Sequence, residues 1–402
     1  MPPSPDGPSA HPPSGPARIL VVDDNEMNRD MLARRLERRG YEVAVAEDGR
    51  RALAMVETGD FDLVLLDIMM PEVNGYEVLE RLKAHETWRH IPVVMISAVD
   101  EMESVVRCVQ LGAADYLPKP FDATLLKARV ESSLAVKRLH DRERAYARSL
   151  ERELEIGREI QRGFLPETLP AAPGWDLAAR CRPARQVAGD FYDAFWMPAE
   201  DDAGGRRLGL VVADVCDKGV GAALFMALFR SLLRATAQAA SGPPPDDPLL
   251  HVARTVNDYI ATTHDRANMF ATVFFGALDP ASGHLRYVNA GHDAPLVVDA
   301  AGRRTRLPPT GPALGLMPEV PLAAGALTLA PGATLAAFTD GASDAQSPEG
   351  AFFGEAHLLD LLAAPAPSAD ALLGRVEAAL AEHAQGAEPF DDVTLLALTR
   401  TG

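Results

Sequence analysis

The chain has 402 residues, a length that predicts two or three domains. Its 47% apolar and 24% charged residues are typical of globular proteins. The net charge of −18 argues against nucleic-acid binding, which depends on a basic surface. Three widely separated cysteines indicate a reducing, cytoplasmic location rather than a disulfide framework. No apolar run reaches the roughly 18 residues needed to span a bilayer, so we expect protein partners and no membrane association.

The chain begins with a stretch rich in proline, serine and glycine, and we expect residues 1–16 to be a disordered tail. Residues 17–135 then alternate apolar strands with amphipathic helices. The predicted strands are 19–22, 41–46, 62–66, 91–96 and 115–117. Five strands separated by helices predict an α/β domain with a doubly wound, five-stranded parallel sheet.

Residues 136–165 are rich in arginine and glutamate and contain no proline. Apolar residues recur there at spacings close to a helical or heptad repeat: Leu139, Tyr146, Leu150, Leu154, Ile160 and Phe164. The pattern predicts a helix, which Pro166 and Pro170 end. It is either a solvated connecting helix or a coiled-coil linker that forms a homodimer, because an apolar stripe must be buried against something.

Residues 166–402 follow a different pattern, in which short strands dominate and longer helices interrupt them. The predicted strands are 209–214, 271–278, 284–290, 295–299, 334–340 and 393–399. The predicted helices are 221–239, 248–262 and 369–385, with a loop at 241–248. Antiparallel strands with segregated helices predict an α+β sandwich flanked by helices.

Polar residues stand at the carboxyl ends of the strands predicted for residues 17–135, where ligands of parallel sheets gather. Asp23 and Asp24 can hold magnesium through their oxygens. Asp67 would be the nucleophile toward a phosphoryl group. Lys119 would neutralise the phosphoryl oxygens, and Ser97 would donate a hydroxyl hydrogen bond to them. The alternative is a flavodoxin-like domain whose polar strand ends are merely solvated.

This domain contains the segments VVDDNEMNRDML, LLDIMMPEVNGYEVL, ISA and DYLPKP. With them, residues 18–135 resemble the receiver domain of two-component response regulators. The resemblance implies that Asp67 accepts a phosphoryl group from a histidine kinase, at a site that binds one magnesium ion. It also implies that Ser97 and Tyr116 reorient after phosphorylation and change the surface of the domain.

A second set of aspartates lies where strands of the C-terminal domain start or end: Asp190, Asp214, Asp340 and Asp391. Side chains alternate faces along a strand, so we expect that Asp190 and Asp193 do not both point inward. The same applies to Asp391 and Asp392. Four converging carboxylates carry about four negative charges, which two divalent cations would balance. Such a centre activates a water molecule and clamps the oxygens of an in-line phosphoryl transfer.

The C-terminal domain contains the segments ELEIGREIQRGFLP, AGDFYDAF, VADVCDKGVGAALFMA, NAGH, FTDGASDA and DDVTLLAL. With them, residues 155–400 resemble a PPM-type metal-dependent serine/threonine phosphatase of the SpoIIE-like bacterial branch. The resemblance implies that Asp190 binds one manganese or magnesium ion and that Asp214 bridges two. It also implies that the Val215 carbonyl is a further ligand and that Asp340 and Asp391 hold the second ion.

Three further residues of this domain could take part in the reaction or bind a ligand. Cys216 follows the bridging aspartate, but no partner base is apparent and the expected metal-activated water makes a thiol nucleophile unnecessary. Lys218 is a turn residue or a phosphate contact rather than a base. His292 is interpreted as a structural residue of a hairpin turn rather than a metal ligand.

Together, these patterns predict a response regulator whose output is dephosphorylation of a phosphoserine or phosphothreonine protein. Relatives of the SpoIIE-like branch usually act on anti-sigma factor antagonists. The alternative is a catalytically silent scaffold that binds its target under receiver control, against which the four intact aspartates argue. A transcription factor is a third class, but no helix-turn-helix-like segment or basic patch supports it.

Overall fold

The computed structural model describes residues 15–97, 102–120, 122–198, 205–239 and 247–402. Most of the tail predicted for residues 1–16, and most of the loop predicted for 241–248, lie outside the described residues. The chain forms two compact units, Met1–Glu151 and Arg152–Gly402.

The N-terminal unit contains one sheet of five parallel strands in the order β2-β1-β3-β4-β5. Its strands are β1 (Arg18–Val22), β2 (Glu42–Ala46), β3 (Leu63–Asp67), β4 (Val93–Ser97) and β5 (Asp115–Pro118). Its helices are α1 (Glu26–Glu37), α2 (Gly49–Thr58), α3 (Gly75–Ala84), α4 (Met102–Gln110) and the first part of α5 (Ala123–Arg162). The predicted doubly wound parallel sheet is confirmed.

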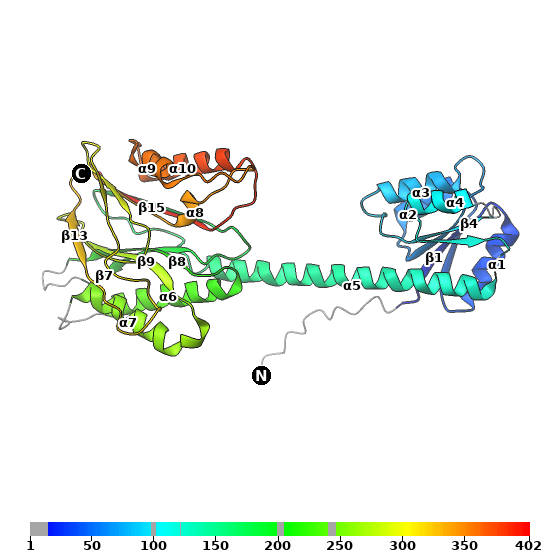
Figure 1. The fold of residues 1–402 in the computed structure, drawn as a ribbon, viewed down its shortest axis with the longest axis horizontal. Helices are drawn as coiled ribbons and strands as arrows, with labels where there is room; N and C mark the ends of the chain where they lie inside the picture. Colours follow the sequence, from blue (N-terminus) through cyan, green and yellow to red (C-terminus); the bar gives the residue numbers. More distant parts are fainter. Residues whose placement is uncertain (1–14, 98–101, 121, 199–204, 240–246) are drawn as a thin grey trace. The chain divides into compact units, whose positions relative to one another are not determined.

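Both faces of this sheet are buried, which explains why its strands read as continuous apolar runs. Leu20 and Val22 point into a core that α2, α3 and α4 cover. Ile19 and Val21 point to the opposite face, which α1 and the start of α5 cover. Figure 1 shows helices on the two sides of the sheet.

The helix α5 has 40 residues and contains the boundary between the two units. Leu126, Val130 and Leu134 pack in the core of the N-terminal unit. The helix then continues without a break through most of residues 136–165, so the predicted linker helix exists. It ends at Arg162, ahead of the predicted end, because residues 163–165 form a turn.

The C-terminal unit contains two five-stranded sheets, ordered β13-β10-β9-β8-β7 and β12-β11-β14-β15-β6, whose strand pairs are antiparallel. The strands of the first sheet are β7 (Phe191–Met197), β8 (Arg207–Val215), β9 (Ala271–Leu278), β10 (His284–Ala290) and β13 (Gly325–Thr328). Those of the second are β6 (Trp175–Arg182), β11 (Leu296–Val298), β12 (Arg304–Arg306), β14 (Thr334–Phe338) and β15 (Val393–Arg400).

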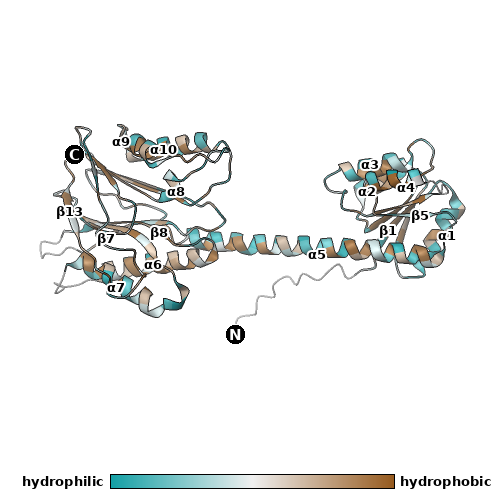
Figure 2. Ribbon diagram, viewed as in Figure 1, coloured by the Kyte–Doolittle hydropathy of each residue, from teal (hydrophilic) through white to brown (hydrophobic). Residues whose placement is uncertain are grey.

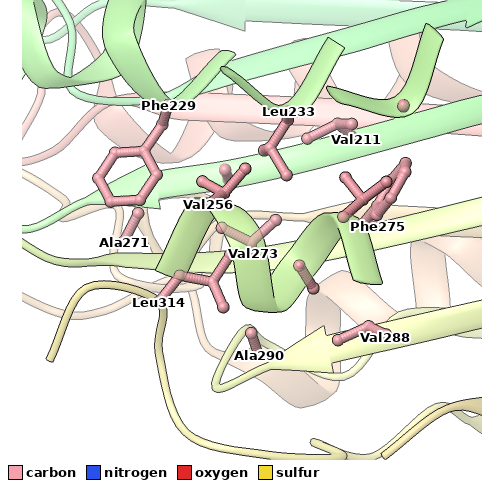
Figure 3. Packing of buried hydrophobic residues seen from close by; sticks show 14 of the residues in the cluster. Val211, Phe229, Leu233, Val256, Ala271, Val273, Phe275, Val288, Ala290 and Leu314 are labelled. Atoms are coloured by element: carbon pink, nitrogen blue, oxygen red, sulfur yellow. The ribbon is translucent and has the colours of Figure 1, made fainter. Parts of the chain in front are cut away.

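Helices cover the outer face of each sheet (Figure 1). They are α6 (Val220–Ala239), α7 (Pro248–Thr263), α8 (Asp340–Ser343), α9 (Glu355–Ala363) and α10 (Ala369–Ala384), with a 3-10 turn at Asp265–Ala267. Phe229 and Leu233 of α6 meet Phe275 of β9 in one core (Figure 3). A second core lies between the sheets, and a third lies under α9 and α10. The predicted α+β sandwich is confirmed.

One described helix, α6, is long and apolar enough to cross a membrane by length and composition alone. This differs from the sequence expectation, because Arg230 and Arg234 interrupt its apolar residues in the sequence. Both arginines face Asp193 of β7, and Met226, Phe229 and Leu233 are buried against the sheet. These are the contacts of a core helix.

Candidate functional site

The polar strand ends of the N-terminal unit converge around Lys119. The Lys119 ammonium donates to Asp23 Oδ2 at 2.7 Å and to Asp67 Oδ2 at 2.9 Å. Asp24 completes a group of three aspartates whose carboxylate oxygens all lie within 4.8 Å of one another. This compact, all-oxygen donor set fits a magnesium ion.

The geometry of this site follows from the sheet topology. β1 and β3 are parallel neighbours, so Asp23 and Asp67 follow them at the same edge. Asn25 caps α1 by accepting hydrogen bonds from the backbone N–H groups of Met27 and Asn28, so the chain turns directly after Asp23 and Asp24. The edge therefore presents its acids on rigid elements.

Burial raises the pKa of Asp67, and the Lys119 ammonium opposes this shift. Burial lowers the pKa of Lys119, but its hydrogen bonds to Asp23 and Asp67 prevail and raise it. Ser97 is buried at the end of β4, and Tyr116 is half-buried on β5. The ammonium thus stays charged beside the carboxylate that was predicted as nucleophile.

The aspartates predicted in the C-terminal unit come from two sheets. Asp190 immediately precedes β7, and Asp214 lies near the end of β8, its antiparallel neighbour. Asp340 follows β14, and Asp391 precedes β15, which is antiparallel to β14. Antiparallel neighbours start and end on the same side, so each sheet brings two acids to one end of the sandwich.

Electrostatic effects show that the two pairs of acids lie near each other. Burial raises the pKa of Asp214, and carboxylates from the other sheet, Asp340 first among them, add to the shift. Burial and then Asp214 raise the pKa of Asp190 well above its usual value. Burial also raises the pKa of Asp340, and Asp391 adds to it. The cluster therefore repels itself in the absence of cations.

In the described part of the chain, only the Lys119 site brings three ligand atoms within 4.8 Å of one another. The acids of the C-terminal unit form a looser group. Their oxygen-only donors are those that manganese and magnesium prefer, and a bound cation would relieve the repulsion that raises their pKa values. The residue types therefore suit divalent cations.

Asp392 and Asp193 are both buried, although the alternation argument predicted that only one member of each pair points inward. Asp392 is 7% exposed, and its carboxylate accepts hydrogen bonds from the backbone N–H groups of Ala184 and Gly189, each at 2.7 Å. Asp190 and Asp392 lie outside the strands, where alternation does not hold. Asp193 does point away from the cluster, but α6 covers that face.

Asp193 is 1% exposed and lies 3.1 Å from Arg230 Nε and 3.4 Å from Arg234 Nη1. Burial raises the pKa of Asp193, and the two arginines oppose the shift. The burial of Asp193 could not be predicted from the local sequence, because its two arginine partners lie on α6, about forty residues further along the chain. Asp193 thus attaches α6 to β7 rather than joining the acidic cluster.

Sequence reasoning also missed Thr339 and Asp293. The Thr339 hydroxyl donates to Asp190 Oδ2 at 2.6 Å and accepts a hydrogen bond from the Thr394 N–H at 2.9 Å. Burial, with repulsion from Asp340, raises the pKa of Asp293 to about 6. Thr339 lies within the segment FTDGASDA and Asp293 directly follows NAGH, so their positions next to Asp340 and His292 were the available signal.

The remaining candidates are Lys218, Cys216 and His292. Lys218 Nζ lies 2.8 Å from Asp391 Oδ2 and donates to the Phe390 carbonyl at 2.9 Å. Cys216 Sγ accepts a hydrogen bond from the Phe270 N–H at 3.1 Å, and burial raises the pKa of its thiol. His292 Nδ1 lies 2.9 Å from the Thr272 hydroxyl, and burial lowers its pKa to about 4, so it is neutral at pH 7.

Two families match the chain. The response regulator receiver domain matches residues 19–131. Stage II sporulation protein E (SpoIIE) matches residues 204–401. These matches cover the unit with the parallel sheet and most of the unit with the sandwich.

Three known proteins illustrate the similarity. Protein IcfG of Synechocystis is 41% identical over 270 residues, which are 62% of this chain and 41% of that protein. Response regulator PleD of Caulobacter vibrioides is 45% identical over 131 residues, 32% of this chain and 29% of that protein. The SiaA-PP2C domain of Pseudomonas aeruginosa is 24% identical with a TM-score of 0.49, over 63% of this chain and 98% of that one. The chain spans less than half the length of these two curated relatives.

Proposed function

Because this chain belongs to the response regulators and joins its receiver domain to a SpoIIE-family domain, we propose that it is a protein serine/threonine phosphatase under receiver control. The observation that carries the proposal is the meeting of aspartates from two sheets at one end of the sandwich. Burial and mutual repulsion raise their pKa values, as expected of a site built for cations. The substrate would be phosphoserine or phosphothreonine in a partner protein.

Two manganese or magnesium ions would supply an activated water molecule there and neutralise the phosphoryl charge. Asp190, Asp214 and the Val215 carbonyl would hold one of them. Asp214, Asp340 and Asp391 would hold the other. The donor set contains oxygen alone, which suits both metals.

Other residues of the chain would orient this centre. The Thr339 hydroxyl fixes one oxygen of Asp190 and would thereby orient the carboxylate toward the metal. Lys218, beside Asp391, offers a positive charge to the phosphate of the substrate. Cys216 accepts a backbone hydrogen bond that holds the turn after Val215, and takes no part in bond making.

In the receiver, Asp67 would accept a phosphoryl group from a histidine kinase, which would place the chain in the cytoplasm. One magnesium ion at Asp23, Asp24 and Asp67 would neutralise the incoming charge together with Lys119. Ser97 would donate to a phosphoryl oxygen, and Tyr116 would change position with it. These roles rest on the position of each residue at the carboxyl edge of the sheet.

The linker part of α5 would pair with the same helix of a second copy. Large apolar residues along it are exposed by 46–73%: Val136, Leu139, Tyr146, Leu150, Ile156 and Ile160. Figure 2 shows brown, hydrophobic bands that recur among hydrophilic residues along α5. A stripe of this kind is typical of a coiled-coil interface, and burying it favours a homodimer.

We further propose that the substrate is a phosphorylated anti-sigma factor antagonist, the class on which relatives of the SpoIIE-like branch act. Dephosphorylation of a candidate protein can be followed by mass spectrometry with manganese present. The proposal predicts phosphate release from phosphoserine that stops with a chelator and resumes when manganese is restored. Release that persists in the chelator, or that survives unchanged in Asp340→Asn, would contradict it.

A further inference from the structure

The last turn of α5 carries a buried amide side chain, that of Gln161, which is 9% exposed. Its Nε2 donates to the Ala188 carbonyl at 2.6 Å, and its Oε1 accepts from the Ala188 N–H at 2.9 Å. One side chain thus satisfies both backbone groups of a single residue, as a neighbouring strand would do.

Ala188 stands two residues before Asp190, in a segment that lies between β6 and β7 and outside both strands. Its neighbour Gly189 donates its N–H to Asp392 Oδ2 at 2.7 Å. The segment therefore receives its hydrogen-bond partners from side chains, and Gln161 supplies those of Ala188.

The segment is also in close contact with a second expected ligand. A Cβ added to Gly189 would lie 2.9 Å from the Val215 carbonyl oxygen and 3.2 Å from the Ala222 Cβ. On the helix side, a Cβ added to Gly157, one turn before Gln161, would lie 3.9 Å from Val187 Cγ1. Residues 187–190 are thus packed between the end of α5 and the turn that follows β8.

We propose that Gln161 is a positioning residue for the proposed metal centre, which it serves by fixing the backbone that presents Asp190. This inference rests on the proposed phosphatase function and names the contact through which the end of α5 acts on it. Because Gln161 belongs to α5, a displacement of that helix would loosen residues 188–190 and weaken metal binding. The position of Asp190 in the proposed metal centre would then depend on whether the end of α5 contacts residues 187–190.

The test is manganese binding to the intact chain, measured by isothermal titration calorimetry and by electron paramagnetic resonance of the free ion. Gln161→Met keeps the side-chain length and apolar contact but removes both hydrogen bonds. We expect it to weaken manganese binding 10- to 100-fold, the range for groups that hold metal ligands in place. Turnover should recover at saturating manganese, so the loss falls on metal affinity rather than on kcat.

Two comparisons separate positioning from general stability. Glu159→Gln changes an exposed residue of the same turn, and we expect unchanged manganese affinity. Gln161→Glu keeps an acceptor for the Ala188 N–H but loses the donor, and we expect an intermediate affinity. Hydrogen–deuterium exchange of residues 183–192 should rise in Gln161→Met and stay unchanged in Glu159→Gln.

Manganese affinity within about twofold of the unmodified protein in both Gln161 variants would overturn the inference, because Gln161 would then be only a helix anchor. If Gln161→Met does not fold, the Gln161→Glu result decides by the same criterion. Failure of the unmodified protein to bind manganese, or equal binding by Asp214→Asn, would instead contradict the proposed function itself, and the inference with it.

Discussion

The two units gather aspartates at the ends of strands, but they balance the charge in different ways. In the receiver, the Lys119 ammonium touches Asp23 and Asp67, and the acids lie within 4.8 Å of one another. In the sandwich, burial and then Asp214 raise the pKa of Asp190, and burial and then Asp340 raise that of Asp214, while the Lys218 ammonium forms its ion pair with Asp391.

This difference indicates what each site needs in order to work. In the N-terminal unit, the fixed Lys119 ammonium offsets part of the negative charge of Asp23 and Asp67. In the C-terminal unit, neighbouring carboxylates raise the pKa values of Asp214 and Asp340, and bound cations would relieve this repulsion. Under the proposed function, the same residue type would serve a switch in one unit and a metal centre in the other.

The largest expected effect comes from Asp214, the aspartate proposed to bridge the two cations. Asp214→Asn should lower phosphatase turnover by at least ~10³-fold, beyond the 10²–10³ typical of losing one charge-stabilising donor. It removes a ligand that both cations would share. Phosphate release from a phosphoserine peptide measures the effect.

Asp217→Asn is the matched control for this change. Asp217 lies in the same turn, is exposed, and adopts a φ of 72°, which asparagine also tolerates. Its Oδ1 accepts the Lys218 N–H, which an asparagine oxygen can do equally well. Turnover within about threefold of the unmodified protein is expected, and an equal loss in both variants would remove the special role of Asp214.

The next largest effect is expected from phosphorylation of the N-terminal unit on the activity of the C-terminal unit. Beryllofluoride at Asp67 should change turnover several-fold, within the roughly 5- to 150-fold range of allosteric coupling, and we expect activation. The continuous α5 provides the connection. Turnover is measured with and without the mimic, in the intact chain and in Asp67→Ala.

A variant with two prolines within residues 142–152 sharpens this test, since they would break the helix. It should not respond to beryllofluoride while it keeps its basal turnover. If it responds like the intact chain, the helix is a passive tether and control must pass through direct contact between the units.

A smaller effect concerns stability and pH. Burial and Asp391 raise the pKa of Asp340 above 3.8, so the folded metal-free chain binds more protons than the unfolded chain above that pH. This site therefore destabilises the fold as pH rises through the raised pKa. Metal-free Asp340→Asn should therefore melt at a higher temperature than the unmodified protein at pH 7.5, and no higher at pH 4.

Differential scanning calorimetry in a chelator measures both melting temperatures. An equal or lower value for Asp340→Asn at pH 7.5 would show that the acids do not repel one another in the folded chain. Added manganese should stabilise the unmodified protein and have little effect on the variant.

The smallest effect is expected for Cys216→Ser. The serine hydroxyl can accept the Phe270 N–H in place of the thiol, so turnover should stay within about threefold. A thousandfold loss with metal still bound would restore a nucleophilic role for the thiol. Peptide dephosphorylation under the conditions of the Asp214→Asn assay gives the comparison.

The receiver sheet could be predicted because its strands are buried on both faces and read as apolar runs, as in residues 19–22. Seven elements of the sandwich were not predicted: β6, β7, β12, β13, α8, α9 and the 3-10 turn. β7 contains Asp193, whose burial depends on arginines of a distant helix, and β6 carries Arg180 and Arg182. Local patterns do not reveal such tertiary partners.

The candidate site was predictable to a similar degree. Acids after strands could be found from the sequence, but the choice between Asp391 and Asp392 could not. Both residues lie before β15, where side chains do not alternate between two faces as they do in a strand. Their environments differ because the backbone N–H groups of Ala184 and Gly189 donate to Asp392. The contact of Gln161 with Ala188 likewise joins two segments that no sequence pattern relates.

The most direct test of the account measures turnover of the intact chain on a phosphoserine protein under four conditions: with and without manganese, and with and without beryllofluoride. The account predicts no turnover without manganese, whether or not beryllofluoride is present. With manganese, it predicts that beryllofluoride changes the turnover several-fold. Turnover that does not depend on manganese would contradict it. So would turnover that, with manganese present, is equal with and without the mimic in a chain that retains Asp67.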